Sequence, residues 1–152
     1  MPLGQKVLRY LPREEQERIS RGTLGLTGGT AAEGFGTCGA IIGACFVVSY
    51  VSGIGWKELG EDVKNSSIPL RNCKIYVTDK CTKQFGSIRC LEIRYRRTGF
   101  AYSFTDRVAF SEALKFAFKT HPERCGMGTI NTPMSMAAGW GAEGVCDVMK
   151  IE

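Results

Sequence analysis

The sequence predicts an all-α fold, a single-domain helical bundle of roughly five or six helices around one buried helix rich in small residues. Residues 38–51 are apolar nearly all round, and residues 70–85 place apolar side chains four apart. No segment has the alternation typical of strands or a hairpin. With 152 residues, 43% of them hydrophobic, the chain can build one core and is too apolar for disorder. We therefore expect one domain over residues 1–152.

The N-terminal residues 1–21 are expected to form a polar arm, and residues 22–152 a cysteine-rich domain. Residues 13–21 are mostly charged and follow Pro12, a pattern that favours a short polar helix. Residues 22–36 are rich in glycine, and each glycine inside a helix costs about 1 kcal/mol relative to alanine. This segment should therefore be a loop, or a backbone packed closely against a cofactor or another helix.

The buried central helix is predicted for residues 38–51, with Thr37 as its N-cap. Small residues give this helix one face that another helix can approach closely. Cys38 and Cys45 lie two turns apart, about 10.5 Å along the axis. They cannot both ligate one small metal site on a straight helix.

The second half of the chain is predicted to add further helices. A glycine-rich turn spans residues 53–60, and Pro69 lies near the next helix start. The apolar side chains that lie four apart in residues 70–85 form one stripe along a predicted helix, made of Cys73, Val77, Cys81 and Phe85. Helix is also expected over residues 88–95 with Gly99 as a C-cap, over 106–120, and over 134–149.

The seven cysteines are spread through the sequence. Their number is odd, and no Cys-x-x-Cys pair of a zinc ribbon or thioredoxin-like site is present. Any metal site must therefore be assembled from cysteines distant in sequence, while buried thiols that only fill the core remain the plainer alternative. A single histidine, His121, excludes histidine-rich metal sites.

Three pieces of the sequence resemble the C_GCAxxG_C_C family of redox-active proteins, found mostly in anaerobic bacteria and archaea. They are Gly34-Phe-Gly-Thr-Cys-Gly-Ala-Ile-Ile-Gly-Ala, then Phe85-Gly-Ser-Ile-Arg-Cys, and Glu123-Arg-Cys followed by Ala137-Ala-Gly-Trp. The resemblance implies a small helical domain whose cysteines hold an iron–sulfur or similar redox centre. A related domain occurs in split-Soret cytochromes, but this chain lacks their haem-attachment motif.

On this resemblance Cys38, Cys90 and Cys125 would ligate an iron–sulfur cluster, 2Fe–2S rather than 4Fe–4S. Family members usually carry a further cysteine before the Cys-Gly-Ala element, and residues 1–37 contain none. We place Cys81 in the predicted ligand set. The fourth ligand nevertheless stays open, and the alternatives are Cys45, Cys73, Cys146, a cysteine of a second subunit or a small-molecule thiol.

The residues add a physical case for two of these ligands. Cys38 at a helix N-terminus and Cys90 beside Arg89 and Arg94 are placed where positive charge favours the thiolate. The glycines predicted to bring backbone N–H groups to the cofactor are Gly36, Gly39 and Gly43.

The expected function is an electron carrier that serves a partner protein, as a homodimer, rather than a stand-alone enzyme. The alternatives are a dithiol/disulfide redox protein without metal and a helical binding module with structural cysteines. We expect the arginine-rich residues 89–97 to bind an acidic partner protein rather than nucleic acid. No apolar run reaches the ~18 residues of a membrane span, and no signal peptide is seen, so we expect a cytoplasmic protein.

Overall fold

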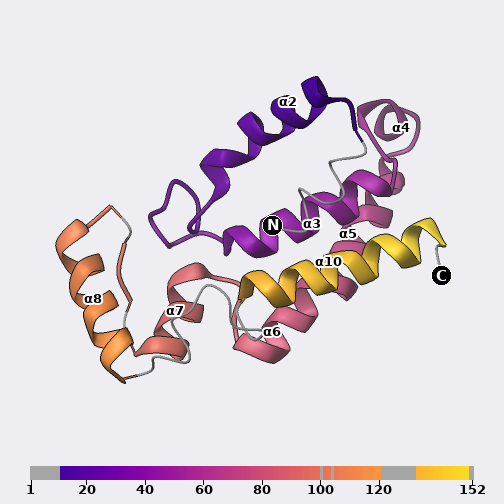
Figure 1. The fold of residues 1–152 in the computed structure, drawn as a ribbon. Helices are drawn as coiled ribbons and strands as arrows, with labels where there is room; N and C mark the ends of the chain where they lie inside the picture. The colour runs from indigo at the N-terminus through magenta and orange to yellow at the C-terminus, as the bar shows by residue number, and fades with distance from the viewer. Residues whose placement is uncertain (1–10, 100, 104, 121–132, 151–152) are drawn as a thin grey trace.

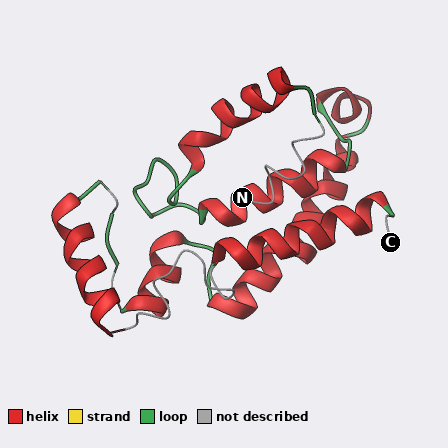
Figure 2. Cartoon of the chain, in the orientation of Figure 1, coloured by secondary structure: helices red, strands yellow, loops and turns green. Residues whose placement is uncertain are grey.

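The computed structural model describes residues 11–99, 101–103, 105–120 and 133–150, and this part of the chain is helical (Figures 1 and 2). The extended pairing among these residues is a single antiparallel bridge between Thr37 and Arg89. The all-α class is therefore confirmed. Cys125 and His121 lie outside the described residues.

The buried centre of the fold is helix α3 (Gly39–Val51), as the sequence predicts. Ile41 and Val48 on this helix have no exposed surface, because α10 (Pro133–Met149) runs beside it (Figure 1). A Cβ atom added at Gly144 of α10 would lie 2.8 Å from Cγ2 of Val48. The missing side chain therefore lets the two helices approach closely.

The predicted helix over residues 70–85 forms as three consecutive pieces. They are α5 (Ser67–Cys73), the π-helical turn η3 (Lys74–Thr78) and α6 (Asp79–Phe85). The stripe faces the core as predicted, with Val77 and Cys81 fully buried. Gly86 ends α6 at a φ of 73°, a left-handed conformation that suits glycine.

Two helices follow this segment. Helix α7 (Cys90–Thr98) ends at Gly99, whose φ of 77° and N–H bond to the Tyr95 carbonyl confirm the predicted C-cap. Helix α8 (Arg107–Thr120) lies at the edge of the molecule in Figure 1, away from α3 and α10. The first described helix, α2 (Arg13–Thr23), has no buried residue and is tied to α3 by a 2.7 Å bond from Tyr50 Oη to Glu15 Oε1.

Several short elements differ from the expectation. The turn predicted for residues 53–60 contains α4 (Trp56–Glu61), and the 3₁₀ turns η1 (Leu24–Leu26) and η2 (Val63–Ser66) were not predicted. Helix α4 begins where the Glu58 carboxylate accepts the Gly55 N–H at 2.8 Å, which satisfies one N–H of the first turn. Asp62 accepts the Lys64 N–H at 2.9 Å in the same way for η2.

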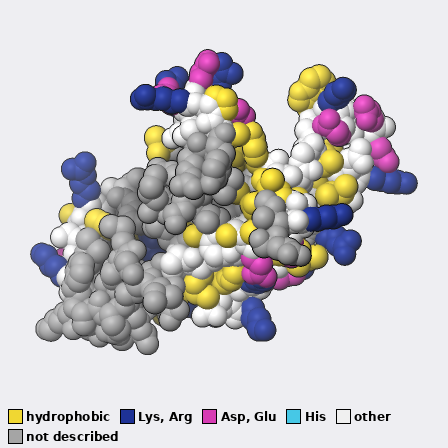
Figure 3. Space-filling model, turned by 45° about the vertical axis from the view of Figure 1, so that its right-hand side comes forward, with side chains coloured by type: hydrophobic (Ala, Val, Ile, Leu, Met, Phe, Trp, Pro, Cys, Tyr) yellow, Lys and Arg dark blue, Asp and Glu magenta, His cyan; other side chains and the backbone are white. Residues whose placement is uncertain are grey.

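The surface drawn in Figure 3 carries lysine and arginine at several separate places, with acidic side chains among them. Exposed apolar side chains include Trp56 on α4 and Leu70 on α5, 87% and 67% exposed. No helix in the described residues is long and apolar enough to cross a membrane.

Candidate redox site

Backbone pairing brings Cys38 and Cys90 together although they are far apart in sequence. The Cys38 N–H donates to the Ile88 carbonyl at 2.8 Å, and the Cys90 N–H donates to the Gly36 carbonyl at 3.0 Å. These bonds flank the Thr37–Arg89 bridge. Because the bridge holds Thr37 in extended pairing, Cys38 rather than Thr37 is the N-cap of α3, which corrects the predicted cap by one residue.

Two helices begin at this pair. Cys38 caps α3, and Cys90 is the first residue of α7. The backbone N–H groups at a helix N-terminus carry partial positive charge, so both helices favour a thiolate at this point. Cys38 is half-buried and Cys90 is buried, with 7% of its surface exposed. Of the two residues, Cys38 therefore has the larger exposed surface.

Each of the two thiols shifts the pKa of the other. A hydrogen bond from Cys90 is the largest influence on the Cys38 thiolate, and with the N–H groups of Ala40 and Ile41 it outweighs burial and lowers the pKa of Cys38 from 9.0 to about 6. The same bond and burial raise the pKa of Cys90. Arg94 Nη2 donates to Cys90 Sγ at 3.2 Å, and its charge lowers the pKa of both thiols. These shifts favour a Cys38 thiolate beside a protonated Cys90 near neutral pH.

A glycine-rich loop covers this pair. Gly28, Gly29, Thr30, Ala31 and Ala32 all have positive φ, a conformation that costs an ordinary L-residue roughly 1–2 kcal/mol. A Cβ atom added at Gly29 would lie only 2.6 Å from Cβ of Cys90. The loop backbone therefore packs directly on the cysteine, as the sequence predicts for a close backbone approach.

Cys81 lies next to this pair, on α6. It is fully buried, its Sγ donates to the Ser87 carbonyl at 3.4 Å, and Ser87 Oγ accepts the Arg89 N–H at 2.9 Å. Burial and the nearby Cys38 thiolate raise the pKa of Cys81 to about 11. Cys81 is thus placed beside Cys38 but holds its proton.

A second pair of cysteines joins α3 to α5. Cys45 lies two turns after Cys38 on α3, and Cys73 is the last residue of α5. Cys73 Sγ donates to the Cys45 carbonyl at 3.2 Å, which places the two thiols close to each other. The interaction between the thiols lowers the pKa of Cys73 to about 7 and raises that of Cys45.

The predicted ligands are thus only partly brought together. Cys38 and Cys90 are adjacent with Cys81 nearby, while Cys146 on α10 is exposed and Cys125 lies outside the described residues. Among the residues that the structure describes, no group of three or more Cys, His, Asp or Glu side chains is arranged to hold a metal ion. The described residues alone therefore do not supply the four thiolates of a common iron–sulfur cluster.

The three predicted cofactor-binding glycines have different surroundings. Gly36 gives its carbonyl to the Cys90 N–H and packs on Gly29. A Cβ atom at Gly39 would lie 3.0 Å from Cα of Thr27, so this glycine also contacts the loop. Gly43 is exposed, and a Cβ atom there would meet nothing within 4 Å.

Comparisons of this chain with protein-family models, with curated proteins and with solved structures give no match. The resemblance to the C_GCAxxG_C_C family stays a prediction from its motifs.

Sequence reasoning did not foresee the partnership of Cys45 with Cys73. One signal was present, because Cys73 begins the stripe that faces the core and Cys45 lies on the buried helix. A second signal could have assigned Ser87 to the site, because Ser87 lies within the Phe85–Cys90 motif. Ser87 is buried and both accepts the Arg89 N–H and bonds Cys81.

Proposed function

We propose that this chain is a thiol-based redox protein whose reactive centre is the Cys38–Cys90 pair. The observation that carries the proposal is the backbone pairing around the Thr37–Arg89 bridge, which brings these two cysteines together at the N-termini of α3 and α7. A thiolate is the reactive form of cysteine, and a neighbouring thiol can resolve the mixed disulfide that it forms. The metal-free dithiol, one of the alternatives from the sequence, thus fits the described residues better than a cluster.

The order of events follows from exposure and charge. The Cys38 thiolate attacks one sulfur of a partner's disulfide, forms a mixed disulfide and releases the first partner thiolate. Cys90 then loses its proton to solvent and attacks Cys38 Sγ, which forms the Cys38–Cys90 disulfide and releases the second partner thiolate. The partner gains two electrons, and its thiolates take up protons from solvent. Arg94 stabilises Cys90 as it ionises, because its guanidinium lies 3.2 Å from that sulfur.

Peptide mapping tests this proposal on the full chain. Trypsin should give residues 22–57, with Cys38, and residues 90–94, with Cys90. After equilibration with oxidised dithiothreitol and blocking of free thiols, we expect these two peptides to be joined by a disulfide. In the Cys45→Ser/Cys73→Ser variant the same cross-link should form. Cys38 and Cys90 both blocked as free thiols after oxidation would overturn the proposal.

An iron–sulfur protein that transfers electrons to a partner is the second candidate. The specific observation in its favour is that Cys81 lies close enough to Cys38 for the charge of the Cys38 thiolate to raise the pKa of Cys81. Iron and acid-labile sulfide analysis of anaerobically purified protein, with its visible spectrum, separates the two functions. Stoichiometric iron and sulfide that Cys38→Ser and Cys90→Ser each abolish would favour the cluster; a colourless, iron-free protein would favour the dithiol.

A further inference from the structure

We infer that Cys45 and Cys73 form a second redox couple, which reduces a low-molecular-weight disulfide such as glutathione disulfide and closes into an α3–α5 disulfide. This inference goes beyond the proposed function, because it requires no reactivity at Cys38 or Cys90. It rests on the placement of the two cysteines, on the way their helices are held and on their access to solvent.

The placement rests on a direct contact. Cys73 Sγ donates to the backbone oxygen of Cys45 at 3.2 Å, so the sulfur of one cysteine touches the backbone of the other. A disulfide needs Cβ atoms about 3.5–4.5 Å apart, and this contact brings the two residues into the range where such a bond is to be tested. Cys38 lies about two turns, or 10.5 Å, before Cys45, at the N-terminus of α3. The Cys45–Cys73 pair is therefore separate from the first pair.

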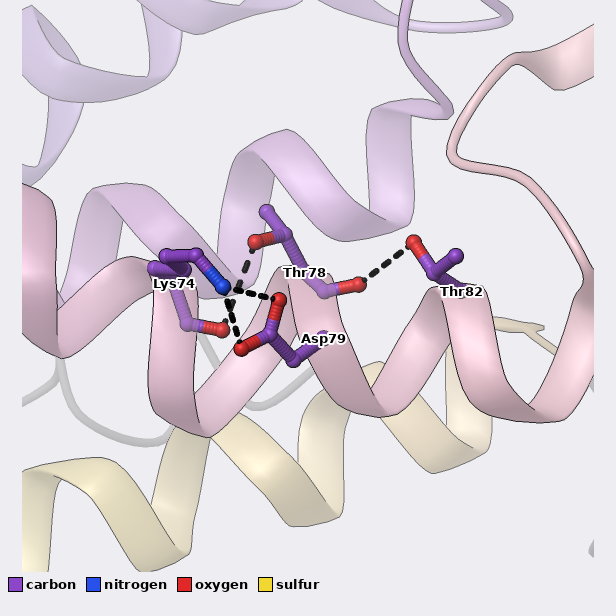
Figure 4. A network of polar contacts seen from close by, with 4 residues as sticks. All are labelled: Lys74, Thr78, Asp79 and Thr82. Atoms are coloured by element: carbon purple, nitrogen blue, oxygen red, sulfur yellow. Dashed lines mark hydrogen bonds and ion pairs between the residues drawn. The ribbon is translucent and has the colours of Figure 1, made fainter.

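The backbone on both sides of this pair is held in place. Asn72 Nδ2 donates to Ser52 Oγ at 3.3 Å, a second bond between the segments that carry the cysteines. The π-helical turn that follows Cys73 is braced by Lys74 Nζ, which contacts both carboxylate oxygens of Asp79 at 2.6 Å (Figure 4). Figure 4 also shows the hydroxyl of Thr78 bonding back to the Lys74 carbonyl. The Asn72–Ser52 bond thus joins the segments that carry the cysteines, and the other contacts hold the turn that follows Cys73.

The access of this pair differs from that of Cys81. Cys45 and Cys73 are half-buried, whereas Cys81 has no exposed surface. The Cys45–Cys73 pair is therefore more open to a small disulfide than Cys81 is. This difference favours a low-molecular-weight substrate for the second couple.

The reaction balances in two exchange steps. The Cys73 thiolate attacks one sulfur of glutathione disulfide, forming a mixed disulfide and releasing one glutathione thiolate. Cys45 then gives its proton to solvent and attacks Cys73 Sγ, which releases the second glutathione thiolate. The protein loses two electrons and becomes a disulfide, and one glutathione disulfide becomes two glutathione thiols after protonation.

The test uses the full chain carrying Cys38→Ser and Cys90→Ser, so that Cys45 is the one cysteine left in tryptic residues 22–57. The protein is treated with glutathione disulfide, blocked with N-ethylmaleimide and digested. We expect residues 22–57 to be joined to residues 72–74, which carry Cys73. Adding Cys45→Ser should replace the cross-link by glutathione on Cys73, and the control Cys146→Ser should leave the cross-link unchanged.

Two results would overturn the inference. One is maleimide on both Cys45 and Cys73 after oxidation, and the other is a cross-link from Cys73 to residues 81–83, which carry Cys81. If the double variant does not fold, the wild-type chain answers the question, because fragmentation between Cys38 and Cys45 locates the disulfide within residues 22–57. The proposed function is read separately from the cross-link between residues 22–57 and 90–94.

Discussion

Replacing Cys90 by alanine should raise the pKa of Cys38 strongly. The hydrogen bond from Cys90 is the largest cause that lowers this pKa from 9.0 to about 6, whereas burial raises it. The thiolate stabilisation is on the order of 4 kcal/mol, at 1.36 kcal/mol for each pKa unit. Without the Cys90 thiol, the N–H groups of Ala40 and Ile41 and the Arg94 charge remain. We expect the pKa of Cys38 to return most of the way to its ordinary value.

The assay is the rate of iodoacetamide alkylation at Cys38 against pH, read from the modified tryptic peptide of residues 22–57. In the wild-type chain the rate should rise with a midpoint near pH 6, because alkylation follows the thiolate fraction. In Cys90→Ala the midpoint should move up by roughly two to three pH units. Cys90→Ser keeps a hydroxyl donor and should give an intermediate midpoint.

Two further variants sharpen this test. Arg94→Met should raise the midpoint by less than Cys90→Ala, because the Arg94 charge is the smallest of the causes that act on Cys38. Cys146→Ser, on the exposed side of α10, should leave the midpoint unchanged. A wild-type midpoint near 9, or one that Cys90→Ala does not move, would refute the assigned hydrogen bond.

Three further predictions concern stability. Because the pKa of Cys38 is lowered in the folded chain, the unfolded reduced chain binds more protons than the folded one between pH 6 and 9. The free energy of unfolding should therefore rise with pH over this range. Because the pKa of Cys90 is raised in the folded chain, the free energy of unfolding should fall with pH above pH 9. Urea unfolding across this pH range checks the sign of both slopes. The form with the Cys38–Cys90 disulfide is the reference, because neither thiol titrates in it. A difference in free energy of unfolding between the two forms that does not change with pH would contradict the prediction. That disulfide should stabilise the chain by about 4 kcal/mol and raise its melting temperature by roughly 10–15 °C. Calorimetry of the Cys45→Ser/Cys73→Ser variant with and without reductant measures this shift, and equal melting temperatures would refute it. Gly29→Ala should destabilise the chain by roughly 1–3 kcal/mol, because the new Cβ would lie 2.6 Å from Cβ of Cys90 and the residue has a φ of +82°. The matched control Gly43→Ala should stabilise the chain by up to ~1 kcal/mol, because a Cβ there meets nothing within 4 Å. Equal effects of the two variants in urea unfolding would argue against the close packing of the loop on Cys90.

The helical framework could be predicted because burial repeats along the sequence. The apolar segment after Cys38 and the stripe through Val77 and Cys81 locate the buried faces without tertiary information. The predicted preference of Cys38 for the thiolate also follows from a local feature, its position at the start of α3. These features depend on neighbours in sequence, so the sequence alone carries them.

The remaining features depend on contacts between distant segments. The Thr37–Arg89 bridge shifts the cap to Cys38, and no local preference of either residue foretells it. The positive φ values at Thr30, Ala31 and Ala32 run against the preferences of those residues. Bonds such as Ala31 N–H to the Gly25 carbonyl at 2.8 Å hold them in place.

The cysteine partners could not be assigned from sequence for the same reason. Cys45 contacts Cys73 because α3 and α5 pack side by side where these two residues lie. Neither the odd number of cysteines nor their spacing in the sequence predicts this contact. The stripe does predict that Cys73 and Cys81 face inward. It does not predict that Cys81 bonds the Ser87 carbonyl while Cys73 contacts α3.

The most direct test of the redox centre is an equilibrium titration of the full chain against reduced and oxidised dithiothreitol, followed by differential alkylation of Cys38 and Cys90. Both cysteines should become protected together, over one two-electron transition, as the ratio shifts toward the oxidant. Cys90→Ser should abolish that transition at Cys38. Protection of Cys38 alone, or reactivity of both cysteines at every ratio, would contradict the assignment of these residues as one redox pair.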